Sequence, residues 1–186
     1  MYQNGYNLDL ESNLPRFSYD EKKIPHIPGS KISIIQTKFY SEYTDSCVDK
    51  FEKIMMNAGV KKSDMTRDMI PGTLEVPLAA RTIVRSIAPS AIAFFGGVVD
   101  TDTKHAEMIM QIFSQEISEV ILQTDTPILV GLIYVPKVRM LIDRCEDNSK
   151  NYGIKIAQAT AEIVSFRLKY QKYSRHELVS PSLVDS

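Results

Sequence analysis

The sequence has no tryptophan, only two cysteines and no marked excess of either charge. Twenty-two lysine and arginine residues stand against 23 aspartate and glutamate residues, so no global field attracts nucleic acid or an anionic membrane. Cys47 and Cys145 form no Cys-x-x-Cys pair and have no histidine at zinc-ligand spacing. We therefore expect a protein of a reducing compartment that holds no metal and binds no nucleic acid.

Long apolar runs are also missing. No run reaches the ~20 residues that a bilayer-spanning helix needs, and the first residues, MYQNGYNLDLESNLPRF, lack the basic and apolar regions of a secretion signal. We expect a cytoplasmic protein without a membrane partner. With 186 residues, 44% of them hydrophobic, the chain is long enough for one full core and too short for two large domains.

The two ends of the chain differ in pattern from its middle. Residues 1–30 are polar, carry Pro15, Pro25 and Pro28, and show neither helical nor strand periodicity, which predicts an extended arm. Such an arm becomes ordered only by lying against another surface, for which a neighbouring subunit is one candidate. We expect a flexible tail over residues 173–186 and a single domain over residues 31–172.

Within this domain, apolar β-branched runs alternate with segments of helical period. Strands are expected at 32–37, 66–70, 91–99 and 127–134, and helices at 41–58, from 77, at 103–123, 136–143 and 151–170. The buried stripe of the first helix is expected to be Val48, Phe51, Met55 and Ala58, and that of the third Met108, Ile109, Ile112, Phe113 and Val120. Parallel neighbours need crossover connections, so this order predicts an α/β three-layer sandwich with a four-stranded parallel sheet flanked by helices.

Ligands of open parallel sheets bind outside the carboxyl ends of the strands. The residues that follow the four expected strands include Phe39, the turn 72–75, the segment 96–105 with His105, and Tyr134. An aromatic ring, a carboxylate, hydroxyl groups and a histidine therefore meet at one edge, which favours a pocket for a flat ring with carbonyl or polyol groups. His105 is the candidate for proton transfer, because imidazole has an unperturbed pKa near ~6.5.

Each of these residues also has an ordinary structural interpretation. Phe39 could belong to the core, Glu75 could be a first-turn carboxylate that complements a helix dipole, and Arg144 could be a cation at a helix C-terminus. Asp100 and Asp102 fit the role of helix-capping acceptors better than that of catalytic acids or metal ligands.

Five segments carry a more specific signal, and they occur in the order in which one family has them: ISIIQTKFYSEYTD, IPGTLEVPLAA, GGVVDTDTKH, PILVGLIY and IDRCEDNSKNYG. Together they resemble the 6,7-dimethyl-8-ribityllumazine synthases from about residue 31 to 170. The resemblance implies the flavodoxin-like fold of that family and a transferase of riboflavin biosynthesis that needs no cofactor. Its reaction condenses 5-amino-6-ribitylamino-pyrimidinedione with 3,4-dihydroxy-2-butanone 4-phosphate, with loss of phosphate and water.

The resemblance also implies a role for each matching residue. Phe39 stacks on the pyrimidine, and His105 transfers protons. Residues expected around the ring and the ribityl chain are Thr73, Leu74, Glu75, Val76, Val98 and Val99. Residues expected around the phosphate are Asp102, Thr103 and Arg144, the last because a planar guanidinium suits an oxyanion. Val130 stands where many members lend an aromatic side chain to the site of the adjacent subunit.

Several positions depart from the family pattern. Asp100 and Thr101 stand where the family usually has Arg-Gly, Tyr152 where many members have Lys, and Lys155 where many have Glu. Carboxylates near a phosphate pocket repel a dianion, and Lys155 is a candidate to restore positive charge. The chain is therefore either an active synthase or a catalytically reduced relative that binds lumazine or flavin, or serves as a structural pentamer.

The resemblance further implies a homo-oligomer with sites between adjacent subunits. Members that close into sixty-subunit shells usually have a glycine-rich turn between the last two helices, and here that turn is EDNSKN, without glycine. We expect a pentamer or a decamer, not a shell, whose other partners are its small-molecule substrates.

Overall fold

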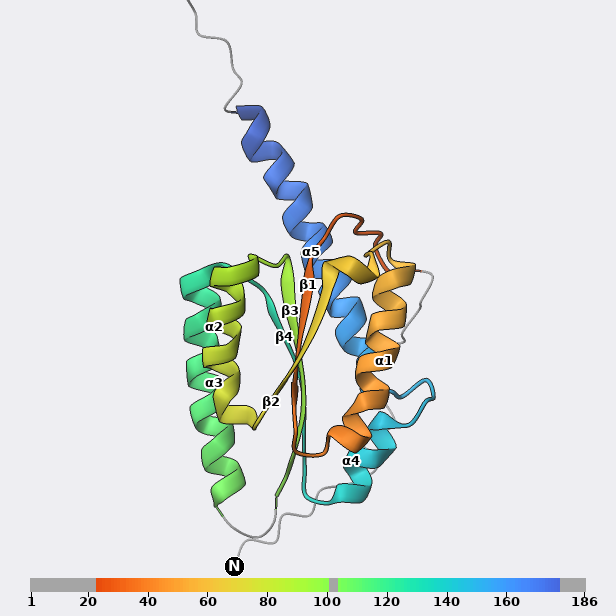
Figure 1. Cartoon of the computed structure of the whole chain (residues 1–186), viewed down its shortest axis with the longest axis vertical. Coiled ribbons are helices and arrows are strands. Elements are labelled where there is room, and N and C mark those ends of the chain that lie inside the picture. The colour runs from red at the N-terminus through yellow and green to blue at the C-terminus, as the bar shows by residue number, and fades with distance from the viewer. Residues whose placement is uncertain (1–22, 101–103, 178–186) are drawn as a thin grey trace, which may run out of the picture.

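Four parallel strands form the centre of the molecule (Figure 1). The structure is a computed structural model that describes residues 23–100 and 104–177. The strands are β1 (Ile32–Thr37), β2 (Met65–Ile70), β3 (Ala91–Val99) and β4 (Ile128–Val135), in the order β2-β1-β3-β4. Every predicted strand is confirmed to within one residue. The apolar runs of β1, β3 and β4 have few alternatives to a buried strand, whereas the polar β2 is an edge strand.

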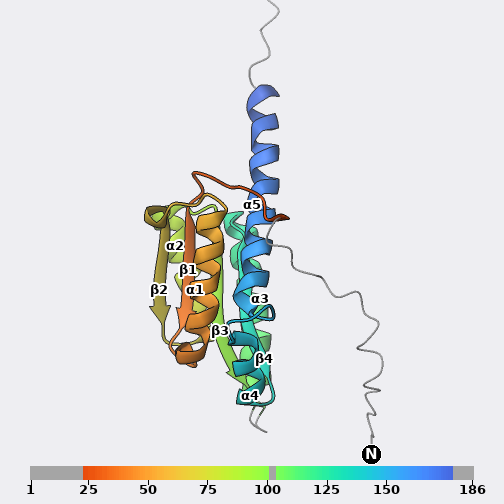
Figure 2. The same cartoon turned by 90° about the vertical axis from the view of Figure 1, so that its right-hand side faces the viewer.

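Helices cover both faces of the sheet, which confirms the three-layer α/β sandwich (Figure 1). One face carries α1 (Ser41–Asn57), α4 (Val138–Cys145) and α5 (Tyr152–Glu177), and the other carries α2 (Val76–Ile87) and α3 (His105–Thr124). Figure 2 shows α1 and α5 side by side on their face. Within residues 23–100 and 104–177, no helix is long and apolar enough to cross a membrane.

The strand β3 connects two hydrophobic cores because its side chains alternate between the faces. Phe95 packs edge-on against Phe51 of α1, with ring centroids 5.4 Å apart. Phe94 points to the other face and lies at 5.4 Å from Phe113 of α3. Such aromatic pairs contribute about 0.5–1.5 kcal/mol each beyond the area they bury, so both helix layers are fixed on the central strand.

The helical stripes are confirmed in α1 but only in part in α3. Val48, Phe51 and Met55 are fully buried, as their spacing predicts. Met108 and Ile112 are 48% and 36% exposed, so the prediction for these two was wrong. The buried face of α3 is formed instead by Ala106, Phe113, Ile117 and Val120. Apolar residues lie on two sides of this helix, and periodicity alone does not say which side faces the sheet.

At both ends, the ordered structure extends beyond the domain predicted from the sequence. Ile27, placed in the predicted arm, is fully buried, and its N–H donates to the carbonyl of Ala58 at 2.7 Å. The last helix continues past Tyr170 to Glu177, so residues 173–177 are helical and not part of a tail. The rest of the predicted arm and tail, residues 1–22 and 178–186, lies outside the described residues.

Candidate functional site

The carboxyl ends of all four strands lie together, at the lower end of the molecule in Figure 1. We refer to this end of the sheet, and not to an outer strand, as 'this edge'. The helices α1, α2 and α3 begin at this edge, since each follows directly on a parallel strand. Their free backbone N–H groups make the edge favourable for anionic and polar groups. The residues that the sequence assigns to the site come mainly from these strand-to-helix junctions.

Phe39 follows β1 and is 68% exposed, so it is not part of the core. The Lys38 N–H donates to the carbonyl of Ile70 at 2.9 Å, which holds the ends of β1 and β2 together. A side-chain carbon at Gly72 would lie 3.8 Å from the ring of Phe39 and 3.1 Å from a carboxylate oxygen of Glu75. The aromatic ring, the glycine turn and the carboxylate are therefore neighbours.

The turn after β2 is a short 3₁₀ segment, η4 (Thr73–Glu75), that leads into α2. Leu74 is 37% exposed and Glu75 is exposed, whereas Thr73 is 8% exposed. Val76 is fully buried, and its N–H donates to the carbonyl of Thr73. Of these residues, Glu75 and Leu74 present their side chains to solvent at the edge, while Val76 stabilises the core under α2.

The end of β3 is shaped by Gly96 and Gly97. A side-chain carbon at Gly97 would lie 2.3 Å from Leu141 of α4 and 3.3 Å from Tyr40, so neither neighbour leaves room for one. The absence of a side chain lets α4 and the start of α1 approach the strand. Val98 is buried under α2 and α3, and Val99 packs partly on the other face. Val98 is 7% exposed, so it is mainly its backbone that is left to face a ligand, whereas the side chain of Val99 is half-buried.

His105 is the first residue of α3 and is exposed. The next residue, Ala106, is buried against the sheet, which fixes the orientation of the first turn. The predicted phosphate-binding residues Asp102 and Thr103, with Thr101, lie outside the described residues.

Arg144 is exposed near the end of α4, on the face of the sheet opposite to α3 and His105. Among the described residues it has no ion-pair partner, while Arg139 of the same helix pairs with Asp143 at 2.9 Å. Within one chain the structure does not bring Arg144 and His105 into contact. The guanidinium group is free to bind an anion from that side.

Two contacts fix the end of α4. Asn151 is 1% exposed; its side-chain oxygen accepts from the N–H of Gly153 at 2.9 Å, and its amide donates to the carbonyl of Cys145 at 3.0 Å. The Cys47 thiol of α1 donates to the Arg144 carbonyl at 3.7 Å. Cys47 and Cys145 are free thiols whose side chains lie within hydrogen-bond distance. The hydrogen bond from Cys145 lowers the pKa of Cys47.

Two further predicted positions lie away from this edge. Val130 is 36% exposed in the middle of β4, the edge strand farthest from β2. Lys155 is exposed on α5, with its Nζ 5.5 Å from the centroid of the Tyr152 ring, a cation–π contact. A single chain therefore does not bring Val130 to the ring-binding residues at the β1–β2 junction.

The structure adds a contact that sequence reasoning missed. The hydroxyl of Tyr134 on β4 donates to the Asp100 carboxylate after β3, at 3.0 Å. Partial loss of hydration, this hydrogen bond, and the charges of Asp100 and Glu107 raise the pKa of Tyr134. The contact follows from the parallel register of β3 and β4, in which Val98 pairs with Tyr134. The sequence does not specify this register, so the contact could not be predicted from it.

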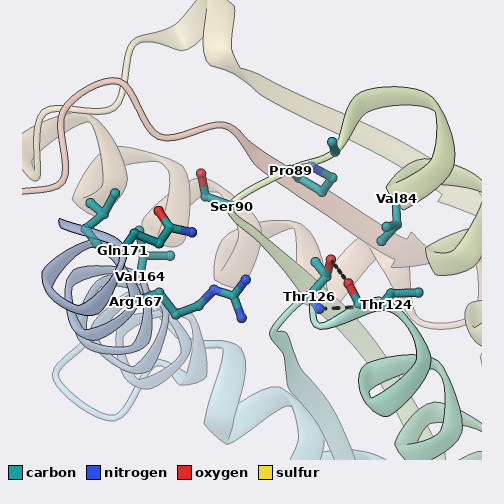
Figure 3. Close-up of a pocket in the computed structure, with 10 residues that line it drawn as sticks. Val84, Pro89, Ser90, Thr124, Thr126, Val164, Arg167 and Gln171 are labelled. Atoms are coloured by element: carbon teal, nitrogen blue, oxygen red, sulfur yellow. Dashed lines mark hydrogen bonds between the residues drawn. The ribbon is translucent and has the colours of Figure 1, made fainter. Parts of the chain in front are cut away.

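A cavity of about 330 Å³ lies at the opposite edge, where β3 and β4 begin (Figure 3). The Arg167 side chain of α5 is directed towards Thr124 and Thr126, which lie at the other side of the cavity. None of the residues that line this cavity is among those predicted to bind substrate. Over residues 23–100 and 104–177, no group of three histidine, cysteine or acidic side chains is arranged to hold a metal ion.

Comparisons with known proteins point to one family. The sequence model of a family described as 6,7-dimethyl-8-ribityllumazine synthase matches residues 29–167. Relatives with that name include proteins of Xanthomonas oryzae pv. oryzae, 28% identical over 138 residues, and Desulfotalea psychrophila, 27% identical over 137 residues. Both alignments cover 74% of this chain, and they cover 90% and 88% of the respective relatives. The matched region includes every described strand and most of the last helix.

Proposed function

Because this chain belongs to the 6,7-dimethyl-8-ribityllumazine synthase family, we propose that it catalyses the condensation that gives that family its name. Its substrates are then 5-amino-6-ribitylamino-pyrimidinedione and 3,4-dihydroxy-2-butanone 4-phosphate, and phosphate and water are lost. The observation that carries the proposal is the exposed ring of Phe39 beside Gly72 and Glu75, at the edge where α3 begins with His105.

The junction of β1 and β2 is the proposed binding place of the pyrimidine. An exposed aromatic ring offers a stacking surface worth about 0.5–1.5 kcal/mol for a flat heterocycle. The Glu75 carboxylate, next to Gly72, accepts hydrogen bonds from ring N–H or ribityl hydroxyl groups. Gly72 leaves the space between ring and carboxylate open. Thr73, Leu74 and the backbones of Val98 and Val99 lie at the carboxyl ends of the same strands, and we propose that they contact the ring and the ribityl chain.

His105 is the proposed proton-transfer residue. The reaction needs a group that gives a proton when water leaves during imine formation, and one that takes a proton as phosphate is eliminated and the ring closes. Imidazole exchanges protons near neutral pH, and His105 stands exposed at the edge where the ring binds.

Arg144 is the proposed phosphate ligand, together with Thr103 and Asp102. Its guanidinium, which has no ion-pair partner among the described residues, offers two parallel N–H donors to a phosphate. Since α4 and α3 cover opposite faces of the sheet, we propose that the Arg144 and the His105 of one site come from two adjacent copies of the chain.

We propose that the working form is a pentamer, alone or stacked as a decamer. A site that includes Val130 needs a second copy, because β4 and β2 are opposite edges of the sheet. Val130, Met108 and Ile112 leave apolar surface exposed on β4 and α3. Sedimentation of the purified chain tests the proposal: five or ten times 21.1 kDa supports it, and a monomer or a sixty-subunit particle contradicts it.

The activity is tested by mixing the purified protein with both substrates and following the absorbance and fluorescence of the lumazine. We expect turnover, and a loss of about 100-fold in kcat for His105→Ala, the lower end of the range for a positioned acid or base. His26→Ala is the matched control, because His26 lies beside Gly59 at the end of α1, away from this edge. Tight binding of flavin or lumazine without turnover would instead identify a catalytically reduced relative.

A further inference from the structure

Tyr134 and Asp100 lie side by side at the carboxyl ends of β4 and β3. The Asp100 N–H donates to the carbonyl of Val135 at 2.9 Å, so the backbone pairing of the two strands continues one residue past β3. The hydroxyl of Tyr134 donates to the Asp100 carboxylate at 3.0 Å. Backbone and side chain of Asp100 are therefore both held by β4.

The charge of this carboxylate affects the binding of the proposed phosphate-ester substrate. Asp100 is half-buried, five residues before His105, the first residue of α3, and a negative charge there opposes the entry of a dianion. A hydroxyl that donates to the carboxylate offsets part of its negative potential and fixes its direction. The pKa of Tyr134 is raised, so the hydroxyl keeps its proton at neutral pH.

We propose that Tyr134 is a positioning residue for the phosphate-bearing substrate: its hydroxyl holds the Asp100 carboxylate against β4 and reduces its repulsion of the substrate phosphate. The proposal rests on the proposed synthase function. It explains how the chain tolerates an aspartate at a position where the lumazine synthases usually have an arginine. Among the described residues, the charged groups that face the hydroxyl are Asp100 on the β3 side and Glu107 on α3.

The test compares Tyr134→Phe, Asp100→Asn and the double variant with the unchanged protein in steady-state assays. Tyr134→Phe frees the carboxylate, so the KM for the butanone phosphate should rise about 3- to 10-fold, a change of the size of one ordinary net hydrogen bond. Both kcat and the KM for the uncharged pyrimidinedione should stay within about twofold. Asp100→Asn should lower the KM for the phosphate substrate, because the repelling charge is gone.

The double variant separates positioning from a general structural effect. In the Asp100→Asn background, Tyr134→Phe should change the KM for the phosphate substrate by less than about twofold, since no carboxylate remains to be held. The effect of Tyr134→Phe alone should also shrink at high salt, as expected of charge repulsion. An equal rise in both KM values, or an unchanged penalty in the double variant, would overturn the proposal.

Matched controls are Tyr170→Phe, which removes a hydroxyl far along α5, and Glu119→Gln, which removes a charge near the other end of α3. Neither should change the KM for the phosphate substrate. If the unchanged protein makes no lumazine, the proposed function fails, but binding of inorganic phosphate followed by ³¹P NMR still tests the pair. Tyr134→Phe should then weaken phosphate binding by a similar factor, and equal binding by both proteins would refute the role of Tyr134.

Discussion

At the scale of single residues, exposure distinguishes side chains that stabilise the fold from side chains available to a ligand. Phe39 and Phe51 are both phenylalanines near the first strand, yet Phe39 is 68% exposed and Phe51 is fully buried against Phe95. A side chain that remains in water contributes little to stability, so the ring of Phe39 is available to stack on a ligand at the carboxyl ends of the strands.

Phe39→Ala should therefore affect binding and not stability. The free energy of unfolding should change by less than about 0.5 kcal/mol, whereas Phe51→Ala should cost about 3–5 kcal/mol. Loss of the stacking surface should raise the KM for the pyrimidinedione about 2- to 10-fold. Urea denaturation and steady-state kinetics measure the two effects. A large loss of stability with an unchanged KM would show that Phe39 is structural.

Tyr134 should make stability depend on alkaline pH. Its pKa is raised above the ordinary 10.0, so the folded state releases this proton less readily than the unfolded state. The stabilisation is fully present below pH 10 and is lost as the pH rises through the pKa of the folded state. Urea denaturation should show a steeper loss of stability above pH 10 for the unchanged protein than for Tyr134→Phe. Parallel curves would contradict the hydrogen bond to Asp100.

At the scale of elements, the site depends on how closely α4 and α5 approach α1. A side-chain carbon at Gly153, in the first turn of α5, would lie 2.0 Å from the carbonyl oxygen of Cys47 on α1. Asn151 caps α5 and also donates to the carbonyls of Cys145 and Glu146 at the end of α4. One buried amide thus joins the helix that carries Arg144 to the rest of the domain.

Asn151→Ala should cost about 2–3 kcal/mol of stability, because it removes a helix cap and the donor to the buried carbonyl of Cys145. Asn151→Ser keeps an oxygen that accepts from the N–H of Gly153, so it should recover about 1 kcal/mol. Urea denaturation of both variants measures the difference. Equal stability of the two variants would show that the cap contributes nothing.

The same elements show why part of the architecture was predictable from sequence and part was not. Apolar runs such as Ala91–Val99 and the stripe through Val48 and Phe51 are local patterns, and local patterns define strands and helices. The contact of Tyr134 with Asp100 depends on strand register. The exposure of Met108 depends on which side of α3 meets the sheet. Neither is encoded in a local repeat, and Arg144 was placed near the site by resemblance alone.

At the scale of the whole molecule, the residues assigned to one site are distributed over both edges and both faces of the sheet. Phe39 and Glu75 lie by β2, Val130 lies on β4, and Arg144 and His105 lie on opposite faces. A cavity between α2, α3 and α5 lies at the other end of the strands (Figure 3). This distribution supports the proposal that a complete site includes residues of a neighbouring copy.

Val130→Lys should disrupt this assembly, because a lysine on an edge strand places a charge where an apolar contact is proposed. Sedimentation should show a shift from the pentamer towards the 21.1 kDa chain, with activity lost in proportion. Ser63→Lys adds the same charge at the exposed turn before β2 and should leave the assembly intact. An unchanged particle with Val130→Lys would remove β4 from the interface.

The proposed synthase activity is tested most directly by one ratio. It is the amount of inorganic phosphate released, divided by the amount of lumazine formed, when both substrates are supplied. We expect one phosphate for each lumazine. His105→Ala should slow the formation of both products by the same factor. Absence of lumazine, or release of phosphate without it, would contradict the account.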